Sequence, residues 1–137
     1  MRPEIDEVFA RFPAPERAGL LILRRLIFEV AEADPEIGPI EEALRWGQPA
    51  YLTRETGAGS TLRLGLPRIG GFALFVHCRT SLIADFRPVA PPDLRFEGNR
   101  AVLFSDAAQI DLSALGVLIR SALRWHLPAE RARRARF

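Results

Sequence analysis

The sequence predicts an α+β domain in which helices pack on one face of an antiparallel sheet. Three observations support this fold class. Apolar residues recur every three to four positions through the first third of the chain, every second position from residue 50, and every three to four positions again near the end. A chain of 137 residues corresponds to a single domain. We place that domain at residues 1–127 and treat residues 128–137 as a basic tail.

The first third of the chain is expected to be helical. Residues 3–12 carry apolar side chains at helical spacing, and Pro15 suits the first position of a longer helix over residues 15–33. The apolar stripe of this second helix is broad, which is typical of a helix buried on much of its circumference. A third, short helix is expected over residues 39–45, with Gly47 just past its C-terminus.

The middle of the chain is expected to form the sheet, because its apolar residues alternate with polar ones. Between the last two expected strands, Gly98-Asn99 is a connection of the type that closes a tight hairpin. A final helix is expected over residues 112–126, with Asp111 as its N-cap. The expected strands cover residues 50–54, 61–66, 72–77, 81–87, 94–97 and 100–104.

The composition excludes several classes of function. The single cysteine, Cys78, leaves no internal disulfide and no multi-cysteine metal cluster within one chain. All 19 basic residues are arginine, which excludes Schiff-base catalysis and a lysine-dependent phosphate loop. Residues 1–12 contain acids and no apolar signal segment, and no apolar run is long enough to span a bilayer. We therefore expect a soluble cytoplasmic protein without a membrane partner.

The positive charge is concentrated near the C-terminus. The formal net charge is +2, but residues 129–137 contain four arginines and one glutamate, and the rest of the chain has 15 arginines against 16 acids. A short basic tail of this kind is typical of a solvated terminus. We therefore do not expect a nucleic acid as partner, because its phosphates need a basic surface on the folded domain.

The most distinctive segment is LRWGQPAY, at residues 44–51. Together with Glu42 it forms the pattern Glu-x-x-x-Trp-Gly-x-Pro-x-Tyr, which resembles a corner found in the YdhG-like family, a bacterial family of unknown function. Residues 72–82 and 96–102 resemble a strand pair and a later hairpin of the same family. The resemblance extends over about residues 5–126, which is nearly the whole chain.

This resemblance implies a compact α+β domain with an antiparallel sheet. Some members of the family have been regarded as frataxin-like iron chaperones, so iron is the cofactor that the resemblance suggests. Iron binding of that kind uses ridges of acidic side chains as hard oxygen ligands. In this sequence the acidic clusters at residues 4–7 and 29–36 look like ordinary solvated helix faces, and we assign no metal ligands.

The corner itself is the first candidate site. Trp46, Gln48 and Tyr51 offer a stacking surface, an amide and a hydroxyl, and Arg45 lies beside them in the sequence. Such a set of side chains can line a pocket for a small anion or a planar ligand. The alternative interpretation is structural, since Trp and Tyr at a corner between a helix and a strand also fill space and tie their polar ends to the backbone.

Three further places carry polar groups suited to a site. His77 precedes Cys78 near an expected strand end, but neighbours on a strand point to opposite faces, which disfavours a catalytic pair. His126 lies at the C-terminus of the last expected helix, where a packing role is the alternative. Asn99 and Arg100 have groups that suit an anionic ligand, and the alternative is that they serve the hairpin turn alone.

The leading hypothesis is a small-molecule or anion-binding module. The sequence lacks the signatures of a dinucleotide loop, a serine-hydrolase elbow and a zinc protease, so it gives no support to catalysis. The alternatives are a homodimeric protein-interaction module, a frataxin-like iron chaperone and a cysteine-dependent enzyme. In the leading hypothesis the pocket is bordered by Trp46, Gln48, Tyr51, His77 and Arg100.

Overall fold

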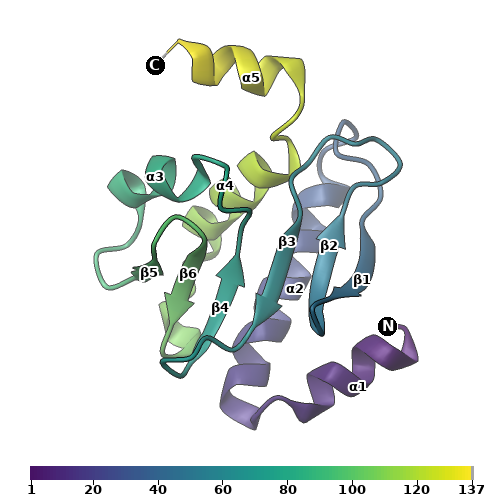
Figure 1. Ribbon diagram of the computed structural model, residues 1–137, viewed down its shortest axis with the longest axis vertical. Coiled ribbons are helices and arrows are strands. Elements are labelled where there is room, and N and C mark those ends of the chain that lie inside the picture. Colours follow the sequence, from purple (N-terminus) through teal and green to yellow (C-terminus); the bar gives the residue numbers. More distant parts are fainter. Residues whose placement is uncertain (137) are drawn as a thin grey trace.

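The computed structural model describes residues 1–136 and confirms an α+β fold (Figure 1). Within these residues six strands form one antiparallel sheet in the order β1-β2-β3-β4-β6-β5. The strands are β1 (Glu41–Arg45), β2 (Gln48–Leu52), β3 (Leu62–Gly65), β4 (Phe72–Phe75), β5 (Arg95–Glu97) and β6 (Ala101–Phe104). The helices are α1 (Pro3–Arg11), α2 (Ala14–Glu32), α3 (Leu82–Phe86), α4 (Leu112–Leu123) and α5 (Pro128–Ala135), with short 3-10 turns at Arg87–Val89 and Ala107–Gln109.

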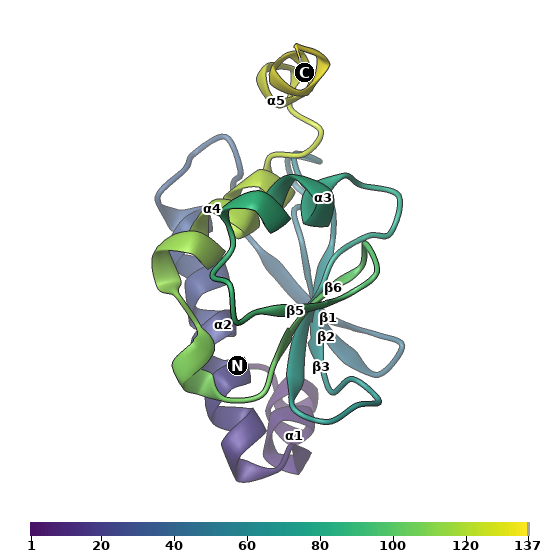
Figure 2. The same cartoon turned by 90° about the vertical axis from the view of Figure 1, so that its left-hand side faces the viewer.

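Helices α2 and α4 lie along one face of the sheet, and the hydrophobic core fills the space between them and the strands (Figure 2). Helix α2 approaches β4 closely because residue 19 is a glycine: a Cβ at Gly19 would lie 2.1 Å from the ring of Phe72. The expected N-cap of the last helix is confirmed, since the Asp111 carboxylate accepts a hydrogen bond from the Ala114 amide at 3.0 Å. The helical residues that are buried in this layer include Leu20, Leu23, Ile27, Leu115 and Ile119.

The two faces of the sheet differ in what covers them. In β3, Leu62 and Leu64 point toward the helices and belong to the main core, while Arg63 between them points the other way. In β4, Phe75 belongs to a second, smaller cluster on that opposite side. No helix of residues 1–136 lies across this second face, which is free on the right of Figure 2. We call it the open face of the sheet.

Residues 41–45 form strand β1, so the helix predicted over residues 39–45 is wrong. The segment has good local helix propensity, but strand pairing outweighs it. Every residue of β1 has a partner in β2, from Glu41 opposite Leu52 to Arg45 opposite Gln48. Gly47 is consequently not a helix cap. It is the second residue of a two-residue hairpin turn and has a φ of 75°.

The strand predicted over residues 81–87 is also wrong, because Leu82–Phe86 is the short helix α3. The alternation of apolar residues in this segment fits a strand, yet the buried side chains Leu82, Ile83 and Phe86 also lie on one side of a helical turn. Its first turn is closed by a hydrogen bond from the Asp85 amide to the Ser81 carbonyl at 2.9 Å. An apolar run this short does not distinguish the two structures by periodicity.

The segment after residue 127 is helical where the sequence predicts a solvated tail. Helix α5 stands away from the sheet at the top of Figure 1. It is attached through Glu130, which is buried and accepts a hydrogen bond from Arg124 Nε at 3.1 Å. Arg134 further stacks on the ring of Trp125, with 3.5 Å between its guanidinium carbon and the ring centroid. Across residues 1–136, no helix has the length and apolar character needed to cross a membrane.

Candidate functional site

The hairpin of β1 and β2 divides the distinctive segment between the two faces of the sheet. Glu42 and Tyr51 are directly opposite each other on adjacent strands and face the helical layer. Arg45 and Gln48 form another opposite pair, at the hairpin end, and face the open side. Because successive residues on a strand alternate between faces, one short segment supplies both a packing contact and part of a surface hollow.

The packing contact ties the hairpin to helix α2. Arg24 donates two hydrogen bonds to the carboxylate of Glu42, at 2.6 Å and 2.9 Å, and the Tyr51 hydroxyl donates to the same carboxylate at 2.8 Å. Tyr51 is fully buried, and this burial together with the charge of Glu42 raises the pKa of its hydroxyl. Tyr51, which the sequence suggests as a ligand-binding residue, thus lies on the helical side of the sheet.

The open face is hollowed beside this hairpin. The hollow has a volume of about 820 Å³, within the range of small-molecule sites. It runs from the β1–β2 turn across β3 to the ends of β4 and β5. Residues 45–48, 61–68, 75–78 and 97–100 each contribute to its wall, and four of the lining side chains are arginines against a single carboxylate. The residues that line it are Arg45, Trp46, Gln48, Thr61, Arg63, Leu66, Pro67, Arg68, Phe75, Val76, His77, Cys78, Glu97 and Arg100.

Arg63 is one of the four arginines that line the hollow. Its guanidinium donates a hydrogen bond to Gln48 Oε1 at 2.6 Å and lies over the ring of Phe75, 5.4 Å from the centroid. Burial, with a contribution from the charge of Arg100, lowers the pKa of Arg63. Arg100 in turn pairs with Glu97, the carboxylate of the hollow, at 2.7 Å. The charge of Arg63 is therefore met by a neutral amide and an aromatic ring.

Gln48 is held in place by a glycine on the neighbouring strand. A Cβ at Gly65 would lie 2.4 Å from Gln48 Nε2, so glycine at this position lets the amide lie where it does without a clash. The amide then lies against β3, and its oxygen is occupied by Arg63. This arrangement orders the side chain before any ligand arrives, and such preorganisation lowers the entropy cost of binding.

Trp46 borders the hollow at the hairpin turn. Its side chain is 91% exposed, the largest value among the exposed large hydrophobic residues. It is also the non-glycine residue of the described chain with a positive φ, at 56°. The turn formed with Gly47 is of the type that favours Asn-Gly, because both central residues need a left-handed backbone. A tryptophan in that conformation is an outlier.

Of the other predicted residues, His77 and Arg100 line the hollow, and Asn99 supports its wall. His77 and Cys78 both line the hollow and are exposed, and His77 Nδ1 accepts a hydrogen bond from the Arg79 amide at 3.1 Å. Asn99 donates to the Cys78 carbonyl at 2.7 Å, which joins the β5–β6 connection to the turn after β4. Within residues 1–136, no group of three His, Cys, Asp or Glu side chains is arranged to hold a metal ion.

His126 does not belong to the hollow. It follows the end of α4, its side chain is exposed, and its backbone amide donates to the Ala58 carbonyl at 2.8 Å. Conversely, Arg63, Arg68 and Phe75 line the hollow, although sequence reasoning does not single them out. The signal for Arg63 is present in the sequence, since it lies between Leu62 and Leu64 in an alternating strand and therefore faces away from the core.

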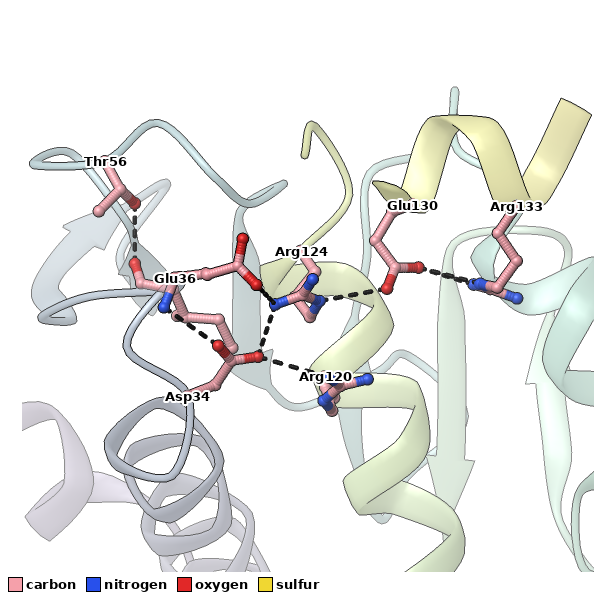
Figure 3. A network of polar contacts seen from close by, with 8 residues as sticks. Asp34, Glu36, Thr56, Arg120, Arg124, Glu130 and Arg133 are labelled. Atoms are coloured by element: carbon pink, nitrogen blue, oxygen red, sulfur yellow. Dashed lines mark hydrogen bonds and ion pairs between the residues drawn. The ribbon is translucent and has the colours of Figure 1, made fainter. Parts of the chain in front are cut away.

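A second arginine centre lies at the other end of the helical layer (Figure 3). Arg124 is buried and its guanidinium contacts three carboxylates: Asp34 at 2.7 Å, Glu130 at 3.1 Å and Glu36 at 3.2 Å. Burial opposes the charge of Arg124, but the hydrogen bonds to these carboxylates outweigh it and raise the pKa. Arg133 of α5 completes the network by pairing with Glu130 at 2.8 Å. This centre joins the end of α2, the end of α4 and α5.

Comparison of the chain with protein-family models, with curated proteins and with solved structures found no match. The functional assignment therefore rests on the geometry of the hollow and on the chemistry of the side chains that line it.

Proposed function

We propose that this protein is a small-molecule binding module that takes an anionic ligand in the hollow on the open face of its sheet. The observation that carries the proposal is the imbalance of charge in the hollow, where four arginines face one carboxylate. A bound carboxylate or phosphate would supply the missing negative charge, and the planar fork of a guanidinium fits either group.

Two buried or half-buried arginines outside the hollow differ from most of those inside it, because they are paired with carboxylates. Arg24 and Arg124 both have carboxylate partners within hydrogen-bond distance. Within residues 1–136, Arg45, Arg63 and Arg68 of the hollow form no ion pair with a carboxylate. Like charges gathered in one place repel each other, and an anion that enters between them relieves that repulsion.

Gln48 and Arg63 are the groups best placed to recognise the ligand. The Gln48 oxygen is taken by Arg63, which leaves the amide nitrogen as a donor, and the guanidinium keeps further N–H groups for a ligand oxygen. Both side chains are fixed by neighbours in the sheet, Gln48 by its fit against Gly65 and Arg63 by the ring of Phe75. The hollow thus offers ordered hydrogen-bond donors to a ligand.

The spacing of the Glu-x-x-x-Trp-Gly-x-Pro-x-Tyr motif is explained by the β1–β2 hairpin. Glu42 and Tyr51, at the two ends of the motif, hydrogen bond to each other across the hairpin, and Trp46-Gly47 forms the turn between them. The motif spacing is therefore the spacing that a two-residue hairpin needs to place these two side chains opposite each other. Membership of the YdhG-like family stays a proposal that rests on the resemblance of the sequence.

Anion binding is tested by isothermal titration calorimetry with inorganic phosphate and citrate at low ionic strength. We expect binding to the wild type and about tenfold or greater weakening in Arg63→Gln, since hydrogen bonds to charged groups contribute about 1.5–3 kcal/mol each. Arg25→Gln is the matched control, because Arg25 lies on α2 with an 83% exposed side chain and outside the hollow. The proposal fails if the wild type binds neither anion, or if both variants lose affinity equally.

A further inference from the structure

Trp46 is placed at the hollow in a way that packing does not explain. Its indole is 91% exposed, so the side chain contributes little to the core. Its backbone has a φ of 56°, a conformation that is unfavourable for a bulky residue. Asparagine or glycine would form the same turn with less strain. The turn therefore retains a strained and exposed aromatic ring beside a cationic hollow.

The ring of Trp46 differs from the other aromatic ring of the hollow. Phe75 is buried and its face is covered by the guanidinium of Arg63, so it is already stacked. Trp46 is accessible to solvent, and an indole face is the strongest aromatic surface for stacking on a second ring or on a cation. The ligand's anionic group is attracted by the arginines, so a second ring in the same ligand is the partner that Trp46 would accept.

We infer that the ligand of the hollow is a planar aromatic anion of about mononucleotide size, whose ring stacks on Trp46 and whose anionic group binds Arg63 and Arg100. This inference rests on the proposed anion-binding function and adds the aromatic half of the ligand. Trp46, Arg63 and Arg100 line one continuous hollow of about 820 Å³. Gln48 lies in the same wall and presents an amide nitrogen toward polar edges of such a ring.

A single small ligand suits the hollow better than a nucleic acid strand. A strand needs a basic track along which several phosphates bind in succession. Outside residues 129–137 the chain has 15 arginines against 16 acids, so the rest of the chain has no excess of positive charge for a long strand of phosphates. The arginine-rich helix α5 projects beyond the end of the sheet that lies opposite the β1–β2 turn, at the top of Figure 1.

The experiment compares the two halves of the ligand. Adenosine monophosphate, adenosine and inorganic phosphate are titrated separately into the wild type and into Trp46→Asn by calorimetry. Adenosine monophosphate should bind the wild type at least tenfold more tightly than phosphate or adenosine, and Trp46→Asn should lose about tenfold for the nucleotide and nothing for phosphate. Because asparagine accepts the left-handed turn, Trp46→Asn should also unfold at an equal or higher temperature than the wild type.

A spectroscopic readout locates the ring. In a Trp125→Phe background Trp46 is the remaining tryptophan, and its fluorescence should be quenched by adenosine monophosphate and left unchanged by phosphate. If the nucleotide binds no better than phosphate, or Trp46→Asn binds it as well as the wild type, the aromatic half is overturned while anion binding stands. If none of the three probes binds, both proposals are overturned. Tighter binding of a five-residue single-stranded oligonucleotide than of the mononucleotide would replace the small ligand with a strand.

Discussion

Arg124 and Arg63 are both partly shielded from water, yet their neighbours differ in charge. The guanidinium of Arg124 contacts the carboxylates of Asp34 and Glu36, which follow α2, and the carboxylate of Glu130 on α5. These contacts raise its pKa in spite of burial. Arg124 therefore acts as a cross-link between parts of the helical layer, with its charge fully compensated inside the protein.

Arg63 is the opposite case. Its direct contacts are the Gln48 amide and the Phe75 ring, and the nearest charge that affects it is that of Arg100. Burial and that like charge lower its pKa. Burial alone therefore does not distinguish an arginine that cross-links the protein from one that could take an anionic ligand. The sign of the neighbouring charges distinguishes the two arginines. This distinction can be tested by replacing each arginine in turn.

The largest effect is expected for Arg124→Met. This change removes the guanidinium that joins Asp34 to Glu130, and breaking such a buried ion pair costs up to about 3–5 kcal/mol of unfolding free energy. Urea denaturation measures that loss. Arg120→Met is the matched control, because its side chain is 57% exposed and 3.6 Å from Asp34, and it should cost less than about 1 kcal/mol. Equal losses in the two variants would show that Arg124 is not a cross-link.

An intermediate effect is expected from acid. Burial opposes ionisation of Glu130, but hydrogen bonds from Arg133 and Arg124 outweigh it and lower its pKa below 4.5. The stabilisation is therefore complete above pH 4.5 and is lost as the pH falls through the lowered pKa of the folded state. Thermal unfolding followed from pH 7 to pH 3 should show a steeper loss in the wild type than in Glu130→Gln. Parallel curves for the two proteins would contradict the contribution of Glu130.

The smallest effect on stability is expected for Arg63→Met. Loss of the contact with Gln48 is offset by relief of the repulsion from Arg100, so the unfolding free energy should change by no more than about 0.5 kcal/mol. Phosphate affinity should nevertheless fall in the same variant. A loss of stability as large as that of Arg124→Met would contradict the difference between the two arginines, because Arg63 would then stabilise the fold as well.

The fold class follows from the sequence where periodicity is unambiguous. The alternation around Leu62 and Leu64 gives β3, and the broad stripe of residues 15–33 gives α2, which the structure places at Ala14–Glu32. Residues 39–45 are predicted to be helical because several of them have high helix propensity. In the structure this segment is strand β1, which is stabilised by its pairing with β2. Pairing of this kind depends on a turn, Trp46-Gly47, whose residues do not match the usual Asn-Gly signal.

Only part of the candidate site can be predicted from the sequence. Arg45, Trp46, Gln48, His77 and Arg100 are candidate residues from the sequence, and all five line one hollow. Tyr51 lies on the other face because it is three residues from Gln48 on the same strand, and an odd separation reverses the face. Arg63 and Phe75, which the sequence does not single out, are brought to the same surface as Arg100 by the neighbouring positions of β3, β4 and β6 in the sheet. Local sequence carries no information on that order, since β4 and β6 are not consecutive.

The strand order also bears on the sequence of events during folding. Within residues 1–136, four of the five strand pairings join strands that are consecutive along the chain, and hairpins of this kind form on the order of microseconds. The contact between Arg124 and Asp34, in contrast, spans 90 residues. We therefore expect the sheet to assemble hairpin by hairpin and the Arg124 cross-link to close last. On the ribosome, a nascent chain that has not yet released residue 124 would already carry the β1–β2 hairpin with Trp46 at its tip.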